Sequence, residues 1–282
     1  MCGFFKRFIP RRFRSKAVEI PVVRLKGIIM DASSPLRQTL SLGSCANALE
    51  KAFSDKEAPA VAIAVNSPGG SPVQSRLIFR RIRDLAEEKN KRVLVFVEDA
   101  AASGGYMIAC AGDEIFADPS SIVGSIGVVS SSFGFTELLK KIGVERRVYT
   151  AGKNKVSLDP FQPEKKADID HLKALQLEIH ETFINLVKER RGTKLSDDAN
   201  LFTGMFWTGK KGKELGLVDE LADLRSVIKH RYGQNAKMRL VSSSRGLFGR
   251  KSPAISAGFV SATVDGLIVS AEERALWQRY GL

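Results

Sequence analysis

The sequence predicts a layered α/β protein in which strands alternate with helices as βαβ units. Three observations support this fold class. Short runs of apolar and β-branched residues recur along the chain, as expected of strands that are buried on both faces. Longer stretches with apolar residues at helical spacing lie between these runs. The chain has 282 residues, of which 44% are hydrophobic and 27% charged, which is typical of a folded protein with a sizeable core.

The first part of the chain carries the clearest pattern. We expect buried strands over residues 22–30, 60–65 and 93–97, and helices over residues 41–53 and 72–89. In the second helix one face is apolar and arginines occupy the other. Two strands joined by such a helix are expected to pair in parallel in one sheet.

The second part is expected to hold shorter elements before one long helix. A short helix begins at Ser103, and short strands follow as far as residue 131. We then expect a helix over 135–142, a strand over 144–149, a loop over 151–163 and a helix over 163–191.

These elements divide the chain into three parts. Residues 1–21 form a basic aromatic arm, residues 22–232 form one catalytic domain, and residues 233–282 form a basic linker with a short amphipathic tail. The formal net charge of +13 is concentrated at the flanks, because residues 1–26 hold eight Lys/Arg against one acid and residues 229–251 hold seven against none. The body is neutral, which argues against a phosphate-tracking groove, so we expect no nucleic-acid partner.

Composition also excludes several kinds of site. The three cysteines, Cys2, Cys45 and Cys110, have no paired spacing, which excludes a disulfide framework and a CxxC zinc site and favours a reducing compartment. No apolar run is long enough to cross a bilayer, and no Walker-type glycine loop occurs. We expect no metal, no cofactor and a cytoplasmic location.

The six Lys/Arg and four phenylalanines of residues 1–16 are typical of a segment that contacts an anionic membrane surface, so the protein is also expected to lie peripheral to the inner membrane.

Two glycine-containing turns follow neighbouring strands. The first reads Asn-Ser-Pro-Gly-Gly-Ser at residues 66–71, and the second reads Ala-Ala-Ser-Gly-Gly-Tyr at residues 101–106. Amides at a helix start point outward as donors, which is what an oxyanion hole requires. Ser103 is either an exposed nucleophile at a helix N-terminus or an N-cap residue. Two such turns after adjacent strands favour a shared pocket.

A nucleophilic serine needs a base, and the residues alone leave its identity open. The three histidines, His171, His180 and His230, do not fall in the loops expected around Ser103, so a Ser-His-Asp triad is disfavoured. The pairs at residues 98–99 and 113–114 are interpreted as solvated carboxylates. Lys153 and Lys155 remain, and a lysine serves as a base only if burial lowers its pKa from about 10.4 toward neutrality.

Five motifs in one order carry a resemblance to a known family. Besides the two turns, the chain reads Val-Gly-Ser-Ile-Gly-Val at 123–128, Gly-Lys-Asn-Lys at 152–155, and Thr-Gly at 208–209 followed by Leu-Gly-Leu-Val-Asp-Glu-Leu at 215–221. Together they resemble the signal peptide peptidase A family, Ser-Lys peptidases of the S49 type with a ClpP/crotonase-like fold. The resemblance covers residues 22–232 and is closest to the short, single-domain form.

The resemblance implies roles for individual residues. Ser103 matches the nucleophile, Lys155 the general base, and Ser125 the serine that orients the lysine amine. The amides of Gly70 and Gly104 match the oxyanion hole. It also implies a ring-shaped homo-oligomer whose site is completed across a subunit boundary, an expectation that the apolar run at residues 201–207 supports.

The resemblance further implies endopeptidase activity on peptides with small or apolar residues, such as signal-peptide remnants. The chain departs from the family pattern in two places: many relatives carry an N-terminal membrane anchor where this chain has its basic arm, and Met107 stands where a second tyrosine is common.

Two alternatives belong to other classes of function. A crotonase-type enzyme acting on acyl-CoA thioesters shares the fold and the paired amides, but it needs no Ser-Lys pair and usually places a carboxylate in its pocket. A non-enzymatic scaffold or nucleic-acid binder would use the basic flanks, and the neutral body counts against it.

Overall fold

A computed structural model describes residues 17–31, 33–34, 37–242 and 274–282. The basic segment 1–16 and most of the predicted linker lie outside the described residues. Within them, no helix is both long and apolar enough to cross a bilayer.

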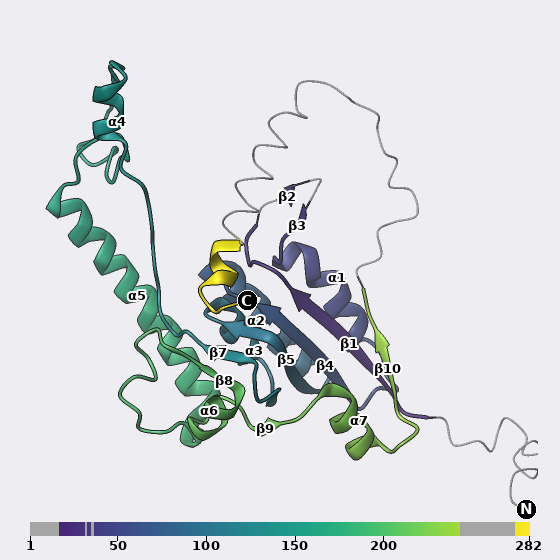
Figure 1. Cartoon of the computed structure of the whole chain (residues 1–282). Coiled ribbons are helices and arrows are strands. Elements are labelled where there is room, and N and C mark those ends of the chain that lie inside the picture. The colour runs from purple at the N-terminus through teal and green to yellow at the C-terminus, as the bar shows by residue number, and fades with distance from the viewer. Residues whose placement is uncertain (1–16, 32, 35–36, 243–273) are drawn as a thin grey trace, which may run out of the picture.

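The centre of the molecule is an eight-stranded sheet in the order β10-β1-β4-β5-β6-β9 (Figure 1). Strand β7 pairs with the end of β5 and carries β8 on its other side. All pairs are parallel except β7 with β8. The strands are β1 (Glu19–Lys26), β4 (Ala60–Ser67), β5 (Arg92–Ala102), β6 (Glu114–Ala117), β7 (Ile122–Gly124), β8 (Phe206–Thr208), β9 (Glu220–Leu221) and β10 (Lys237–Leu240). A separate two-stranded hairpin joins β2 (Ser33–Ser34) and β3 (Arg37–Gln38).

Helices cover both faces of the sheet, which confirms the layered α/β fold. They are α1 (Leu42–Phe53), α2 (Pro72–Glu88), α3 (Gly104–Ala109), α4 (Thr136–Lys141), α5 (Lys166–Arg191), α6 (Gly209–Glu214) and α7 (Leu224–Tyr232). One apolar cluster packs α1, α2, α3 and the end of α5 against one face, and a smaller cluster packs α7 against the other. All eight residues of β4 are buried because it lies between these two layers.

The segment from residue 128 to residue 179, which we call the projecting arm, extends away from the sheet (Figure 1). It contains α4 and the first half of α5, and the buried residues of α5 all lie in its second half. The strand predicted over 144–149 is wrong: these residues form no strand and are all exposed. Their β-branched residues suggested a strand, but the arm places them away from the sheet, so no described strand is available to pair with them.

Strand β10 forms within the stretch that the sequence analysis assigned to a linker. It pairs with β1 in register Glu19–Lys237 to Val22–Leu240 and widens the sheet by one edge strand. Two of its four residues are exposed and two are half-buried, and such a short strand leaves no periodic pattern in the sequence.

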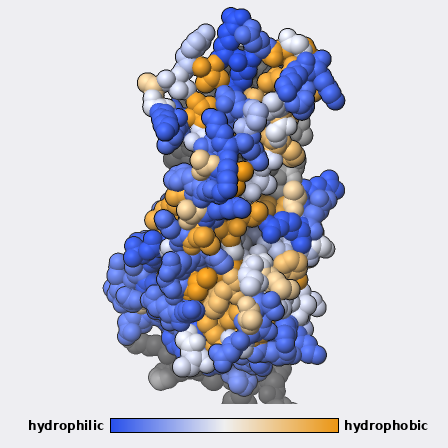
Figure 2. Space-filling model, turned by 90° about the vertical axis from the view of Figure 1, so that its left-hand side faces the viewer, coloured by the Kyte–Doolittle hydropathy of each residue, from blue (hydrophilic) through white to orange (hydrophobic). Residues whose placement is uncertain are grey.

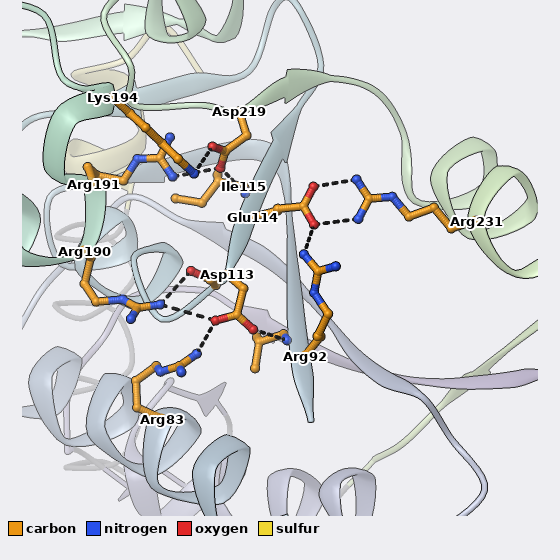
Figure 3. A network of polar contacts seen from close by, with 12 residues as sticks. Arg83, Arg92, Asp113, Glu114, Ile115, Arg190, Arg191, Lys194, Asp219 and Arg231 are labelled. Carbon is orange, nitrogen blue, oxygen red and sulfur yellow. Dashed lines mark hydrogen bonds and ion pairs between the residues drawn. The ribbon is translucent and has the colours of Figure 1, made fainter. Parts of the chain in front are cut away.

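A polar network fixes the C-terminal end of α5, the helix that carries part of the arm, to the sheet (Figure 3). Buried Arg191, at the end of α5, forms an ion pair with Asp219 at 2.8 Å, and Lys194 reaches the other carboxylate oxygen at 2.6 Å. Arg190 donates to the Cys110 carbonyl at 2.9 Å and so ties α5 to the end of α3. The C-terminal end of α5 is therefore anchored to the helix that begins after Ser103.

Candidate active site

Ser103 lies between the end of β5 and the start of α3. Its amide donates to the Gly124 carbonyl at 2.8 Å, and its carbonyl accepts from the amides of Tyr106 and Met107. The serine occupies the N-cap position, but its side chain makes no capping hydrogen bond. The hydroxyl is therefore not used to cap α3, and the interpretation of Ser103 as a capping side chain is wrong.

The backbone at Ser103 has φ 52° and ψ −122°, a conformation that favours glycine. A non-glycine residue held there costs about 1–3 kcal/mol. Ser125 has φ 54°, so both serines assigned from the resemblance have left-handed backbone. Such strain persists only where the surrounding structure enforces it, and it is concentrated at functional sites.

The first glycine turn lies directly against Ser103. A Cβ on Gly69 would stand 2.8 Å from the Ser103 Cβ, so a larger residue has no room there. Gly70 has φ 140°, and a Cβ on it would stand 2.1 Å from the Ile29 carbonyl oxygen. The turn therefore requires both glycines, and they allow it to approach the start of α3 closely.

The amides of Gly70 and Gly104 are not used within the fold. Neither donates to a backbone or side-chain acceptor in the part of the chain that the structure describes. Gly70 is exposed and Gly104 is buried. A Cβ on Gly104 would meet the Ser75 Oγ at 2.3 Å, so this glycine lets α3 pack closely on α2. Two free donors beside a serine hydroxyl fit the chemistry of an oxyanion hole.

Ser125 follows β7 and is brought beside Ser103 by strand pairing. The register matches Ala102 at the end of β5 with Gly124 at the end of β7, so the next residues of both strands leave the same edge of the sheet. Ser125 is buried, and its amide donates to the Met205 carbonyl at 2.7 Å. The structure thus brings Ser103, Ser125 and the glycine turn together at the carboxyl edge of the sheet.

In the part of the chain that the structure describes, neither candidate lysine is hydrogen-bonded to Ser103. Lys153 and Lys155 are both exposed in the loop between α4 and α5, on the projecting arm. No hydrogen bond joins either lysine to Ser103 or Ser125 among the described residues.

Among the described residues, no histidine or carboxylate is hydrogen-bonded to Ser103 either. His180 contacts the Ile126 carbonyl at 2.9 Å, and none of the three histidines bonds to Ser103 in the described part of the chain. Asp99 accepts from the Asn66 amide nitrogen at 2.6 Å. Asp113 and Glu114 are not the solvated loop charges that we expected, because both belong to the network of Figure 3.

Two residues near the site were missed by the sequence analysis. Buried Asn66 donates to Asp99 and accepts from the Ala100 amide, so it couples the glycine turn to the irregular end of β5. A polar residue directly after the apolar run of residues 60–65 was the available signal. Tyr280 lies against Ser125 with its hydroxyl 3.2 Å from Oγ, and no local pattern links residues so distant in sequence.

Comparison with known proteins decides the family. The model of the family described as "Peptidase family S49" matches residues 86–238. The chain belongs to peptidase family S49. The predicted family and fold class are confirmed.

Several curated proteins are similar to the chain. It is 66% identical to "Na(+)/H(+) antiporter NhaA" of Brucella abortus, over 99% of this chain and 39% of that protein. It is 30% identical to "Serine protease SPPA, chloroplastic" of Arabidopsis thaliana, over 80% of this chain and 35% of that protein. It is 32% identical to "Putative signal peptide peptidase SppA" of Enterococcus faecium, over 61% of this chain and 50% of that protein. The chain spans half or less of the length of these three relatives.

Proposed function

We propose that the chain is a serine endopeptidase in which the Ser103 hydroxyl attacks the carbonyl carbon of a peptide bond. The observation that carries this proposal is the geometry at Ser103. An uncapped serine is held at positive φ, at the sheet edge, beside two amides that no described group accepts from. A fold that needed only a turn here would be more stable with glycine.

The reaction follows from these groups. As the C–O bond forms, a neutral lysine amine takes the Ser103 proton, and the amides of Gly70 and Gly104 donate to the developing oxyanion. Collapse of the tetrahedral adduct breaks the C–N bond, and the lysine ammonium returns the proton to the leaving amine. Water then attacks the acyl ester and gives a proton to the lysine. The ester C–O bond to Ser103 breaks, and the released Ser103 oxygen takes that proton from the lysine.

We further propose that Lys155 of a second copy is this base. Lys155 stands on an arm that extends away from its own Ser103, and the arm carries most of the exposed large apolar residues of the described chain. Phe133 is 80% exposed, Leu177 68% and Ile142 60%. Figure 2 shows apolar patches between hydrophilic residues on the side of the molecule where the arm lies. Contact with another copy would cover these patches and bury the lysine, which favours the neutral amine.

The proposed substrates are peptides with small or apolar residues, such as signal-peptide remnants. A pocket of about 280 Å³ lies between the first half of α2, α3 and the middle of α5, and both apolar side chains and two arginines line it (Val73, Leu77, Met107, Ile179, Arg76 and Arg80). Its apolar part supports an apolar preference because an apolar side chain is favoured there. The name of the Enterococcus relative supports the same substrate class.

The peptidase proposal is favoured over three other functions. The antiporter name belongs to a protein of which this chain spans 39%, whereas the matching family model is that of a peptidase. A crotonase-type reaction usually relies on a pocket carboxylate, and within the described residues no carboxylate bonds to Ser103 or Ser125. A nucleic-acid-binding scaffold would leave the strained serine unexplained.

The test is covalent labelling with a fluorophosphonate, which reacts with activated serines. We expect one label, on Ser103, in the full chain, and none in Ser103→Ala. Lys155→Ala should lose labelling and peptide hydrolysis, whereas the neighbouring Lys153→Ala keeps both. Labelling elsewhere, or loss with Lys153→Ala alone, contradicts the assignment.

We also propose that residues 1–16 make a peripheral contact with the surface of anionic membranes. Their charge and phenylalanines support this, since each basic residue near such a surface contributes about 1 kcal/mol. Co-sedimentation with anionic vesicles at low salt, with and without residues 1–16, tests the proposal. Equal binding of both proteins contradicts it.

A further inference from the structure

The loop that carries Lys155 ends in a shielded carboxylate. This loop joins α4 to α5 on the projecting arm (Figure 1), and every residue from 144 to 155 is exposed. The side chain of Asp159, four residues after Lys155, is only 6% exposed. The arm therefore covers one carboxylate while it leaves the neighbouring lysine open to solvent.

Both carboxylate oxygens of Asp159 have a partner. Oδ2 forms an ion pair with the Arg146 guanidinium, and Oδ1 accepts from the Phe161 amide at 3.1 Å. The hydrogen bond from Arg146 lowers the pKa of Asp159 below its usual value of 3.8, so the carboxylate is ionised at neutral pH. The same guanidinium lies over the Phe161 ring, 4.9 Å from its centroid. We call these three residues, Arg146, Asp159 and Phe161, the clamp.

The clamp is connected to the starts of both helices of the arm. The Phe161 ring packs on Phe135, the residue before α4, with centroids 5.5 Å apart, and the Phe135 amide donates to the Pro160 carbonyl at 2.7 Å. The Leu158 amide donates at 3.2 Å to Asp168, in the first turn of α5. Leu158 has φ 56°, a strained conformation that persists only where the surrounding contacts enforce it. Residues 158–161 are therefore fixed from two sides.

The turn that precedes the clamp is held by local bonds. The Lys155 amide donates to the Gly152 carbonyl at 3.2 Å, and the Ser157 hydroxyl donates to the Asn154 carbonyl at 3.0 Å. The Lys155 amine makes no hydrogen bond or ion pair in the part of the chain that the structure describes. The structure thus combines a free amine with a loop whose C-terminal end is fixed.

We propose that the clamp positions the Lys155 amine for Ser103 of a second copy. This inference rests on the proposed function, in which that amine takes the Ser103 proton. A base has to lie within about 2.6–3.2 Å of the hydroxyl, and a displacement of about 1 Å can lower a rate about 100-fold. The clamp narrows the range of positions that the long lysine side chain samples. Its residues act through Lys155 and are positioning residues.

The first experiment measures peptide hydrolysis by variants of the full chain. Asp159→Ala removes both contacts of the carboxylate and is expected to lower kcat at least tenfold with KM unchanged, because only the base is displaced. Asp159→Asn still accepts from the Phe161 amide but loses the ion pair, so its kcat should be intermediate. Glu145→Ala, the matched control, removes an exposed ion pair with Arg147 (2.8 Å) on the same arm and should leave kcat unchanged. A kcat of Asp159→Ala equal to that of the control, or a change in KM alone, overturns the proposal.

The second experiment shows which copy needs the clamp. When Ser103→Ala and Lys155→Ala chains are produced together, the first supplies the lysine and the second the serine of each active site. Adding Asp159→Ala to the chain that supplies the lysine should lower the recovered rate at least tenfold. Adding it to the chain that supplies the serine should leave the rate unchanged. Equal losses from both placements would reveal a general effect on the arm and overturn the proposal.

The third experiment detects the clamp without peptide hydrolysis. Trypsin cuts after Lys153 and Lys155 only when the loop opens locally, and mass spectrometry of the first fragments gives the rate. Asp159→Ala should be cut there at least several-fold faster than Glu145→Ala. Faster cutting when no chain hydrolyses peptide, the unchanged chain included, overturns the proposed function and supports the clamp contacts. Hydrolysis by the unchanged chain with equal cutting of the two variants supports the proposed function and overturns the clamp.

Discussion

The strained backbone at Ser103 makes a prediction that can be measured without any substrate. Replacing Ser103 by glycine removes the side chain that conflicts with φ 52° and ψ −122°. No capping hydrogen bond is lost, because the serine side chain makes none. We therefore expect Ser103→Gly to abolish peptide hydrolysis and at the same time to stabilise the fold.

The size of the effect follows from two opposing terms. Relief of the left-handed conformation returns about 1–3 kcal/mol. Glycine makes the unfolded chain more flexible, which costs about 0.5–1 kcal/mol. The free energy of unfolding should therefore rise by up to about 2.5 kcal/mol, which in a chain of this size raises the melting temperature by up to about 4 °C.

Ser103→Ala is the matched control, because it removes the same hydroxyl and keeps the strain. Chemical denaturation of the three proteins, with equal slopes against denaturant, gives the comparison. We expect the glycine variant to have the largest free energy of unfolding, and the alanine variant to have a value close to that of the unchanged chain. A glycine variant no more stable than the alanine variant would refute the inference that this serine is retained at a cost in stability.

Three further predictions concern the rest of the fold and site. Asp219→Ala leaves the buried Arg191 guanidinium without its carboxylate and should cost about 3–5 kcal/mol of unfolding free energy, measured by denaturation; a loss under 1 kcal/mol would contradict the role of the network. Hydrogen bonds and the charge of Arg231 hold the pKa of Glu114 below its usual value of 4.5. The ionised Glu114 therefore stabilises the fold above pH 4.5, and this stabilisation is lost as the pH falls from 4.5 through the lower pKa of the folded protein. The difference in stability between the unchanged chain and Glu114→Gln should accordingly shrink below pH 4.5, and a pH-independent difference would contradict this. Gly70→Ala places a Cβ 2.1 Å from a backbone oxygen and should lower peptide hydrolysis at least tenfold, through displacement of the glycine turn; an unchanged rate would show that the turn is not part of the site.

Much of the sheet and both glycine turns could be predicted because their causes are local. Strand β4 is buried on both faces, and that leaves a run of apolar residues that can be recognised without the structure. The turns after β4 and β5 need glycine for reasons of backbone conformation and space, so they are visible as sequence motifs.

Features that depend on distant partners could not be predicted in the same way. Residues 144–149 have the composition of a strand, but the arm places them where no described strand can pair with them. The contact of Tyr280 with Ser125 joins residues 155 apart in sequence. The position of Lys155 away from its own Ser103 depends on the direction of the arm. That direction follows from α5, whose C-terminal end is held by the ion pair of Arg191 and Asp219.

The central claim is that Ser103 of one copy and Lys155 of another form one site, and mixing two inactive variants tests it most directly. Ser103→Ala and Lys155→Ala are produced separately and together, and peptide hydrolysis is measured at equal total protein. Each variant alone should be inactive. In a random mixture about a quarter of the sites combine an intact serine with an intact lysine from a neighbour, so the co-produced protein should recover about a quarter of the full rate. A mixture as inactive as either variant alone would contradict a site shared between copies.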